Sequence, residues 1–173
     1  MKRIVRNQKG LTLIELLAVV VILGIIAAIA IPAVGGLIDN AKKDAHAANA
    51  IQMIDSAKLA VIGHREVRPP ASGDVVYIPL QWLIDEGYLD EAKDPDGGQY
   101  EPGSETFELR IGGGGGPSVP GTYVRVEADG PSHKFGAFTD NGKRGVRNAA
   151  GNNGSNVGDY VEEHSITRAK VQN

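Results

Sequence analysis

The feature that most constrains this chain is an apolar run near its N-terminus. Residues 16–31 contain no polar side chain, and the apolar stretch as a whole extends from Leu11 to Ile31. A helix of about 20 apolar residues is long enough to cross the hydrocarbon core of a bilayer. The first ten residues carry four basic side chains and no acid, so the positive-inside rule places them in the cytoplasm. The sequence therefore predicts a transmembrane helix over residues 11–31.

One acidic residue, Glu15, stands inside this apolar run. A charge near the bilayer centre costs about 2.5–3.5 kcal/mol on insertion scales, so a carboxylate kept there is expected to have a partner. Its position alone leaves two interpretations open. The side chain can extend to the membrane interface near the end of the helix, or it can pair with a cation at the same depth.

Three interpretations of the N-terminal segment compete. It can be a plain signal anchor, or a cleaved secretory signal that uses the small-x-small pattern at residues 28–30. The length of the apolar run, the presence of Glu15 and the continuing helical pattern beyond residue 30 speak against a secretory signal. The third interpretation places the processing point between Gly10 and Leu11.

The stretch KGLTLIELL at residues 9–17 resembles the type IV prepilin signature. That signature has a short basic leader ending in glycine, an apolar first mature residue and glutamate at the fifth mature position, which here are Gly10, Leu11 and Glu15. Leu11 stands where phenylalanine is most usual, and leucine is an accepted variant. The resemblance covers about the first 60 residues. It implies cleavage after Gly10 by a prepilin peptidase and N-methylation of Leu11.

The resemblance also implies a partner for Glu15. In this family, the Glu15 carboxylate would reach the new terminal amine of a neighbouring subunit and set the register of assembly. At about 4 Å in partly desolvated surroundings, such a pair gains several kcal/mol and offsets much of the burial cost. The implied partners are further copies of the chain in a helical homopolymer, the peptidase/methyltransferase, an assembly ATPase with its membrane platform, and inner-membrane lipid before assembly.

Gly24 and Pro32 interrupt the expected helix. Proline removes one helical hydrogen bond and usually produces a kink, although transmembrane helices tolerate it. The resemblance implies more, because in assembled pili this stretch often loses helicity and lets the filament extend. We expect Gly24 and Pro32 to provide this flexibility.

Beyond Pro32 the apolar pattern becomes amphipathic, with apolar residues mostly three or four positions apart. Gly63 and the prolines at 69–70 predict the end of the helix. The expected organisation is a leader at residues 1–10, a long helix at 11–63 and a globular head at 64–173. The residues expected to face the head are Leu37, Ala41, Ala45 or Ala48, Ile51, Ile54, Ala57 and Val61.

The head combines the pattern of one short helix with that of several strands. The fold class is α+β: a long N-terminal helix, transmembrane in its first half and amphipathic in its second, packs on a small antiparallel sheet. This is the type IV pilin fold that the resemblance implies. The expected elements are a short helix within 79–89 that starts near Pro79 and stops at Gly87, strands at 106–111, 122–128 and 134–139, a last strand within 159–171, and turns at 94–98 and 140–142.

Motifs that carry chemistry are few. The chain has no cysteine, which excludes disulfides, thiolate catalysis and cysteine-ligated zinc. The glycine run at 112–116 lacks the Gly-Lys-Ser/Thr ending of a nucleotide loop. The four histidines share no metal-ligand spacing, so each is expected at the surface or in a turn. We expect no active site and no cofactor.

Asp94 and Asp96 resemble the opening of an EF-hand calcium loop, which makes them a calcium candidate. Gly98 stands at the third ligand position, and Gln99 stands where the sharp turn needs glycine. Residues 78–98 are also similar to the LxxxGYL…DP(W)G stretch of type II secretion pseudopilins and some Gram-positive pilins. Asp96 replaces the usual aromatic residue, which weakens an assignment to the secretion branch.

Charge is distributed unevenly over the expected head. Residues 74–108 hold ten acids against one base, whereas Lys134, Lys143, Arg144 and Arg147 form a later basic group. Two such patches can meet between neighbours stacked head to tail. Nucleic acid is a further candidate partner of the basic group. Against it, few aromatic residues lie between these bases, and loss of the leader takes the formal net charge from −3 to −7.

We therefore expect a structural protein and not an enzyme: the major pilin of a type IV pilus. It would be anchored in the cytoplasmic membrane before assembly and extracellular afterwards. A pseudopilin of a type II secretion or competence DNA-uptake system is the alternative within the family, and a mature length of 163 residues slightly favours a true pilin. A membrane-anchored binding module that uses the helix only as a tether represents a different class.

Mass spectrometry of the mature chain tests the predicted processing. We expect loss of residues 1–10 and the added mass of one methyl group on Leu11, because the peptidase that cuts after Gly10 also methylates the new amine. A chain that begins at Ile31 would identify a secretory signal instead. A mature protein that still begins with Met1 would contradict the prepilin interpretation.

Overall fold

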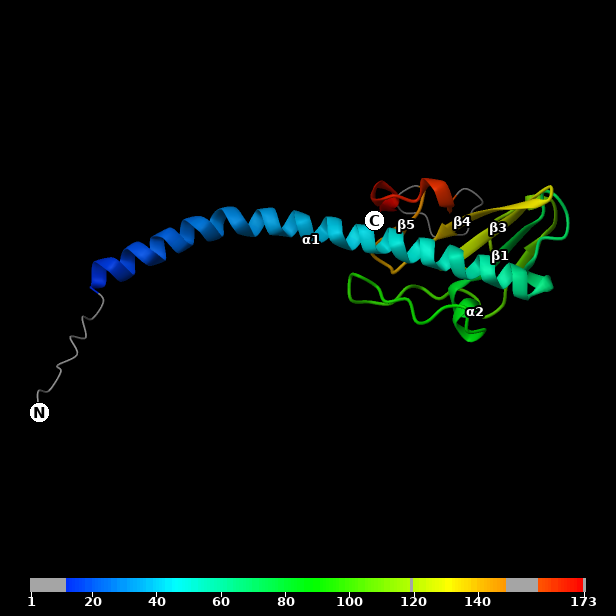
Figure 1. Ribbon diagram of the computed structural model, residues 1–173, viewed down its shortest axis with the longest axis horizontal. Coiled ribbons are helices and arrows are strands. Elements are labelled where there is room, and N and C mark those ends of the chain that lie inside the picture. The colour runs from blue at the N-terminus through cyan, green and yellow to red at the C-terminus, as the bar shows by residue number, and fades with distance from the viewer. Residues whose placement is uncertain (1–11, 119, 149–158, 173) are drawn as a thin grey trace, which may run out of the picture. The chain divides into compact units, whose positions relative to one another are not determined.

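A computed structural model of the protein describes residues 12–118, 120–148 and 159–172 (Figure 1). The longest element is helix α1, Leu13–Gly63, which runs as one α-helix of 51 residues and includes Pro32. The predicted helix is therefore confirmed to within two residues at its start. The chain divides into two compact units, Met1–Asp39 and Asn40–Asn173, so the second half of α1 belongs to the same unit as the sheet.

The first half of α1 carries a continuous exposed apolar surface. Every large apolar side chain from Leu13 to Ile38 is at least half exposed, and Leu13 itself is 85% exposed. By length and composition this helix can cross a membrane. Glycine at the last position of α1 has a packing reason, because a Cβ on Gly63 would lie 2.4 Å from the hydroxyl of Tyr88.

The face of α1 that packs into the head differs in part from the predicted one. Ile54, Ala57 and Val61 are buried as expected, but Leu37 is 69% exposed and Ile51 39% exposed. Apolar residues lie on more than one face of this helix, so the spacing alone selected members of different faces. The buried residues are His46, Ala47, Ala50, Met53, Ile54, Ser56, Ala57, Ala60 and Val61.

A five-stranded antiparallel sheet with the strand order β2-β1-β3-β4-β6 forms the centre of the head (Figure 1). The strands β3 and β4 pair over seven residues, from Tyr123 opposite Phe138 to Asp129 opposite Ser132. The bounds are β1 Val75–Pro79, β2 Glu108–Arg110, β3 Tyr123–Asp129, β4 Ser132–Phe138 and β6 Val161–Glu162; β5 Gly145–Val146 pairs separately with β7 Val171–Gln172.

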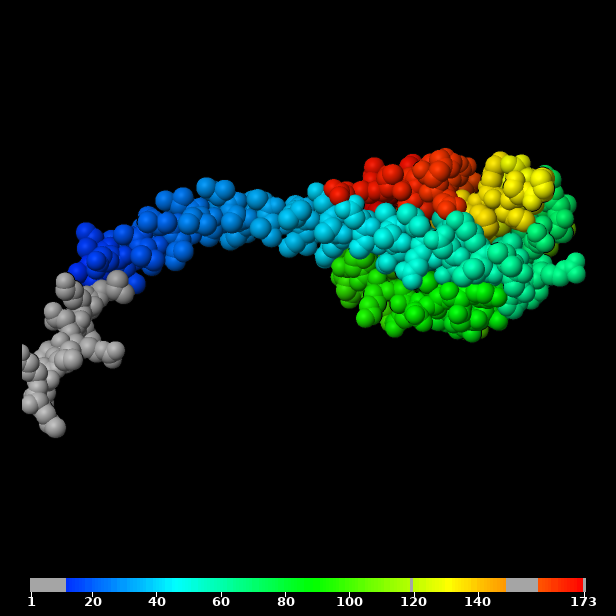
Figure 2. Space-filling view, viewed as in Figure 1, coloured from blue at the N-terminus to red at the C-terminus, as the bar shows by residue number. Residues whose placement is uncertain are grey.

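Short helices complete the head. Helix α2, Leu80–Asp85, follows β1 directly and lies beside the second half of α1. Figure 2 shows the green segment that contains α2 on one side of the cyan part of α1 and the red C-terminal segment on the other. The 3₁₀ turns are η1 Arg65–Val67, η2 Ile111–Gly113, η3 Glu163–Ser165 and η4 Arg168–Lys170.

The predicted α+β class is confirmed, and three of the predicted strands correspond to β2, β3 and β4. The prediction missed β1, although this strand lies between β2 and β3 in the sheet. All five residues of β1 are buried, so its sequence lacks the alternation that marks a half-exposed strand. Helix α2 begins directly after Pro79 and ends at Asp85, two residues before the predicted stop at Gly87, where the chain turns with φ of +74°.

Alternate side chains of the sheet divide between two apolar clusters, as the two faces of a strand require. The larger cluster joins one face of the sheet to α1 and α2, and it includes Ala50, Val126 and Leu83, each 0% exposed. The smaller cluster lies on the opposite face and contains Val75, Tyr77, Tyr123 and Phe138. The sheet thus has no fully solvated face at its centre.

Leu83→Ala should lower the free energy of unfolding of the head by about 2–5 kcal/mol, because it leaves a cavity in the larger cluster. Urea titration of the full chain in mild detergent, followed by the fluorescence of buried Trp82, measures the effect. Leu59→Ala is the matched control, since Leu59 is 59% exposed on α1; we expect a change within about 0.5 kcal/mol. Equal effects of the two substitutions would contradict the described core.

Candidate functional site

The predicted assembly residues lie at the start of the chain. Gly10 and Leu11 fall outside the described residues, whereas Glu15, Gly24 and Pro32 lie on α1. Gly24 has open space around it, with no atom within 4 Å of an added Cβ. The helix continues through both Gly24 and Pro32, and their role in filament flexibility stays a prediction.

Glu15 closes a hydrogen-bonded ring at the beginning of α1. Its Oε2 accepts the backbone N–H of Thr12 at 2.8 Å and the Thr12 hydroxyl at 2.7 Å, while the Glu15 N–H donates to Thr12 Oγ1 at 3.3 Å. This is the reciprocal arrangement of a capping box, with Thr12 as N-cap and Glu15 three residues later. The pattern T-x-x-E is visible in the sequence at residues 12–15, and the sequence analysis missed it.

Both hydrogen bonds to the Glu15 carboxylate go to the same oxygen. Among the described residues, Oε1 accepts no hydrogen bond, so it can receive a second donor without breaking the cap. The capping box also fixes the side chain at the helix terminus. Glu15 therefore has a role within its own chain, and it still presents one oxygen outward.

A second group of polar side chains is buried inside the head. His46 of α1 is 0% exposed, and the side chains of Asp94 and Asp96, from the turn after α2, are 1% and 7% exposed. His46 Nε2 lies 3.1 Å from Asp96 Oδ2 and 3.6 Å from Asp94 Oδ1. The prediction that every histidine occupies the surface or a turn was wrong for His46. A lone histidine in an alanine-rich helix gave no signal of its distant partners.

One tautomer of the His46 ring satisfies both of its hydrogen-bond partners. With the proton on Nε2, the ring donates to Asp96, and Nδ1 accepts the hydroxyl of Tyr100 at 2.7 Å. The Tyr100 oxygen in turn accepts the Asn49 amide at 3.1 Å. Burial, opposed by the Asn49 hydrogen bond, raises the pKa of Tyr100 to about 12. The phenol is therefore a hydroxyl donor throughout the physiological range.

Asp96 is the point where positive charges converge. Its Oδ1 lies 3.3 Å from Lys42 Nζ on α1, and its Oδ2 forms an ion pair with Arg144 Nε at 2.9 Å. Burial raises the pKa of the Asp96 carboxyl, but the hydrogen bonds from His46 and Lys42 and the charge of Arg144 outweigh it and hold the pKa below its ordinary value. This carboxylate joins α1 to the turn between β4 and β5.

Asp94 is held mainly by neutral donors. Its oxygens accept the backbone N–H of Asp96 at 2.9 Å, that of Gly98 at 2.8 Å and the side-chain amide of Asn141 at 2.9 Å. Burial raises the pKa of the Asp94 carboxyl, and these hydrogen bonds more than offset the rise, so the pKa is lowered. A Cβ at residue 98 would lie 2.8 Å from Asp94 Oδ2, which explains glycine there.

The structure brings the two calcium candidates together and adds a histidine. One ligand-type atom from each of His46, Asp94 and Asp96 lies within 4.8 Å of the others. Calcium prefers oxygen ligands, and histidine favours transition metals. Lys42 and Arg144 already supply the positive charge that a metal would bring. Calcium binding stays a prediction, and the contacts are those of a buried charge network.

The later basic residues do not form one open positive patch. Lys134 pairs with Asp129 at 2.8 Å, and Arg147 pairs with Asp140 at 2.8 Å. Arg144 contacts Asp96 as described above. The charge group expected to contact a neighbour or nucleic acid is therefore largely neutralised inside the chain.

Acid stability tests the buried network. Because the folded-state pKa values of Asp94 and Asp96 are lowered, their stabilisation is complete above the ordinary pKa of about 4 and is lost as the pH falls through the lowered values. Asp96→Asn should cost about 3–5 kcal/mol at pH 7 and flatten the pH dependence below ~4. Asp90→Asn, at an exposed position, should do neither in pH-resolved urea titrations.

Comparison with known families matches residues 5–31 to the family described as Prokaryotic N-terminal methylation motif. No curated protein and no solved structure matches the chain. The family match supports a type IV pilin-like protein or a pseudopilin, and it implies processing by a prepilin peptidase and assembly into a pilus or a secretion system. Together with the apolar half of α1, it fits a membrane-anchored precursor. Residues 5–31 thus carry the class III prepilin-type signal of type IV pilins and pseudopilins.

Proposed function

We propose that this chain is the major structural subunit of a type IV pilus and that it polymerises through the first half of α1 into an extracellular filament. One observation carries the proposal: a prepilin-type signal leads directly into a helix whose large apolar side chains are all at least half exposed up to Ile38. An apolar surface of this extent requires lipid or other protein around it. Membrane burial before assembly and helix packing afterwards provide both environments.

The geometry of Glu15 supports an assembly role for this residue. The capping box holds Oε2, and among the described residues nothing bonds to Oε1. After cleavage, the terminal amine of a neighbouring subunit is a cation that can approach this oxygen. In an apolar surrounding a charge-assisted contact of this kind is stronger than in water. We infer that Thr12 orients the carboxylate and that the neighbour's amine neutralises it.

A pseudopilin of a type II secretion or competence DNA-uptake system is the second candidate. The similarity of residues 78–98 to a pseudopilin stretch favours it. Asp96 at the usual aromatic position and the mature length of 163 residues favour a pilin. A membrane-anchored binding module is the candidate from a different class, and filaments sheared from cells separate it from a major pilin, because a major pilin forms abundant surface fibres and a tethered module stays in the membrane fraction.

Glu15→Ala should abolish incorporation into filaments, while the protein stays in the membrane with a folded head. Thr12→Ala is the matched control, because both substitutions break the capping box and only the first removes the carboxylate. Loss of an N-cap costs about 0.5–2 kcal/mol, so Thr12→Ala should reduce incorporation without abolishing it. Immunoblots of sheared filaments and membranes measure both pools.

Two outcomes would contradict the assembly role. If Glu15→Ala polymerises like the parent chain, the carboxylate is not required for assembly. If both variants fail to the same degree, Glu15 acts only as a helix cap.

A further inference from the structure

The turn between β4 and β5 contains the dipeptide Asn141-Gly142. Asparagine is a chemically labile residue, and a following glycine makes it more so, because glycine has no Cβ to hinder attack by its own backbone nitrogen. Asn141 is also part of the buried network of Asp94 and Asp96, since its side-chain amide donates to Asp94 Oδ1 at 2.9 Å. A labile group therefore forms a contact that helps to hold the head together.

The reaction open to this dipeptide is loss of the side-chain amide. The Gly142 nitrogen attacks Cγ of Asn141, so that a nitrogen–carbon bond forms and the Cγ–Nδ2 bond breaks. The proton lost from the Gly142 nitrogen leaves with the amide group as ammonia, and a five-membered cyclic imide remains. Water then opens the ring at either carbonyl and leaves aspartate or isoaspartate at position 141. No oxidation or reduction takes place.

The structure holds the Asn141 side chain by both of its polar atoms. Oδ1 accepts the backbone N–H of Lys143 at 2.9 Å and that of Arg144 at 2.7 Å, as asparagine does in many turns. Nδ2 donates to Asp94. Attack on Cγ has to come from above the plane of the amide, and a side chain fixed at both polar atoms cannot rotate to meet it.

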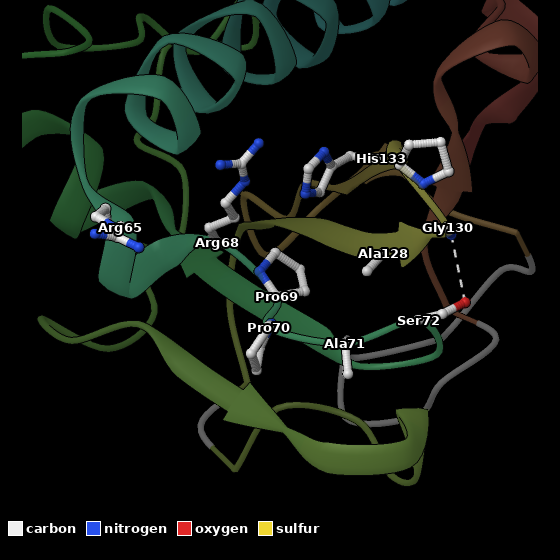
Figure 3. Close-up of a pocket in the computed structure, with 10 residues that line it drawn as sticks. Arg65, Arg68, Pro69, Pro70, Ala71, Ser72, Ala128, Gly130 and His133 are labelled. Carbon is white, nitrogen blue, oxygen red and sulfur yellow. Dashed lines mark hydrogen bonds between the residues drawn. The ribbon is translucent and has the colours of Figure 1, made fainter.

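The attacking nitrogen is engaged as well. The Gly142 N–H donates to Asp140 Oδ1 at 2.9 Å, and the same oxygen accepts Arg147 Nη2 at 2.8 Å. The turn between β3 and β4 is held by a longer contact, because its Gly130 N–H donates to the Ser72 hydroxyl at 3.3 Å (Figure 3). The turn that carries Asn141 therefore has to open before its two reacting groups are released.

Loss of the amide would change the network permanently. A carboxylate oxygen in place of Nδ2 would face Asp94 Oδ1 at 2.9 Å and Asp96 Oδ2 at 3.5 Å. The side chains of these two acids are 1% and 7% exposed, so solvent screens a third negative charge poorly. One hydrogen-bond donor would also be lost. The modified turn can no longer form the contact with Asp94 that the amide formed.

We propose that Asn141 is a deamidation site controlled by the conformation of its turn. The network preserves the amide while the turn is closed, and opening of the turn permits the reaction with water as co-reactant. The product prevents the turn from closing as before, so a transient opening becomes a permanent chemical change. This inference goes beyond the proposed filament function and does not depend on it.

Incubation of the full-length protein in mild detergent at mildly alkaline pH, with and without guanidinium chloride, tests the site. Peptide mapping by mass spectrometry follows the amide at residue 141. We expect the folded chain to lose it at least about tenfold more slowly than the unfolded chain, because a turn held by several hydrogen bonds is open for a small fraction of the time. The Asn-Gly pair at residues 153–154 is an internal reference in denaturant, where both pairs should react at rates within about twofold.

Two results of the incubation would overturn the proposal. Equal rates at residue 141 with and without denaturant would show that the network gives no protection. Faster loss in the folded chain would show that Asp140 acts as a base on the Gly142 N–H and promotes the reaction.

A pair of variants tests the consequence of the modification. Asn141→Asp should lower the midpoint of the urea transition followed by Trp82 fluorescence, because it places a carboxylate against Asp94. Gln52→Glu adds the same charge at an exposed position of α1 and should leave the midpoint unchanged. Equal midpoints for Asn141→Asp and the parent chain would contradict the proposed effect on the network. The incubation uses the parent chain alone, so it stays decisive if Asn141→Asp fails to fold.

Discussion

The head depends on close packing between the second half of α1 and one face of the sheet. Ala50, Ala57 and Ala60 are 0% exposed and belong to the apolar cluster that α1 shares with the sheet. At the exposed end of the helix, a Cβ on Gly63 would lie 2.4 Å from the hydroxyl of Tyr88. Larger side chains on this face would force the helix away from the sheet or strain it. The second half of α1 therefore needs small side chains on its packed face, whereas the first half carries a continuous exposed apolar surface.

Polar contacts secure α1 where its buried stripe begins. His46 is the first buried residue along the helix, and with Lys42 it meets the carboxylate of Asp96. The ion pairs of Asp96 with Lys42 and Arg144, and its contact with His46, hold the turn that carries Asp96 and the turn that carries Arg144 against α1. The charge network around Asp96 therefore stabilises the beginning of the packed face of α1, and buried apolar side chains stabilise the rest of it.

Sequence patterns predicted the structural features that are determined by residues close together in the chain. Local residue spacing, or a local glycine or proline, identifies each of four features: the long helix, its end at Gly63, the three strands and the prepilin-type signal. The sequence could not predict β1, because a fully buried strand has no alternation. Nor could it predict the network of His46, Asp96 and Arg144, whose members lie about 50 residues apart in the chain and meet only through the tertiary fold. The capping box at Thr12 was readable, and it shows that Glu15 has a local partner as well as an implied distant one.

The edges of the sheet are short: β2 has three residues and β6 has two. An edge strand exposes unpaired backbone groups to which a strand of another molecule can add. In a filament, heads are held at very high local concentration for long periods, which favours such uncontrolled strand exchange. The two edge strands themselves offer few such groups, which favours growth of the proposed polymer through its helices over strand addition at β2 or β6.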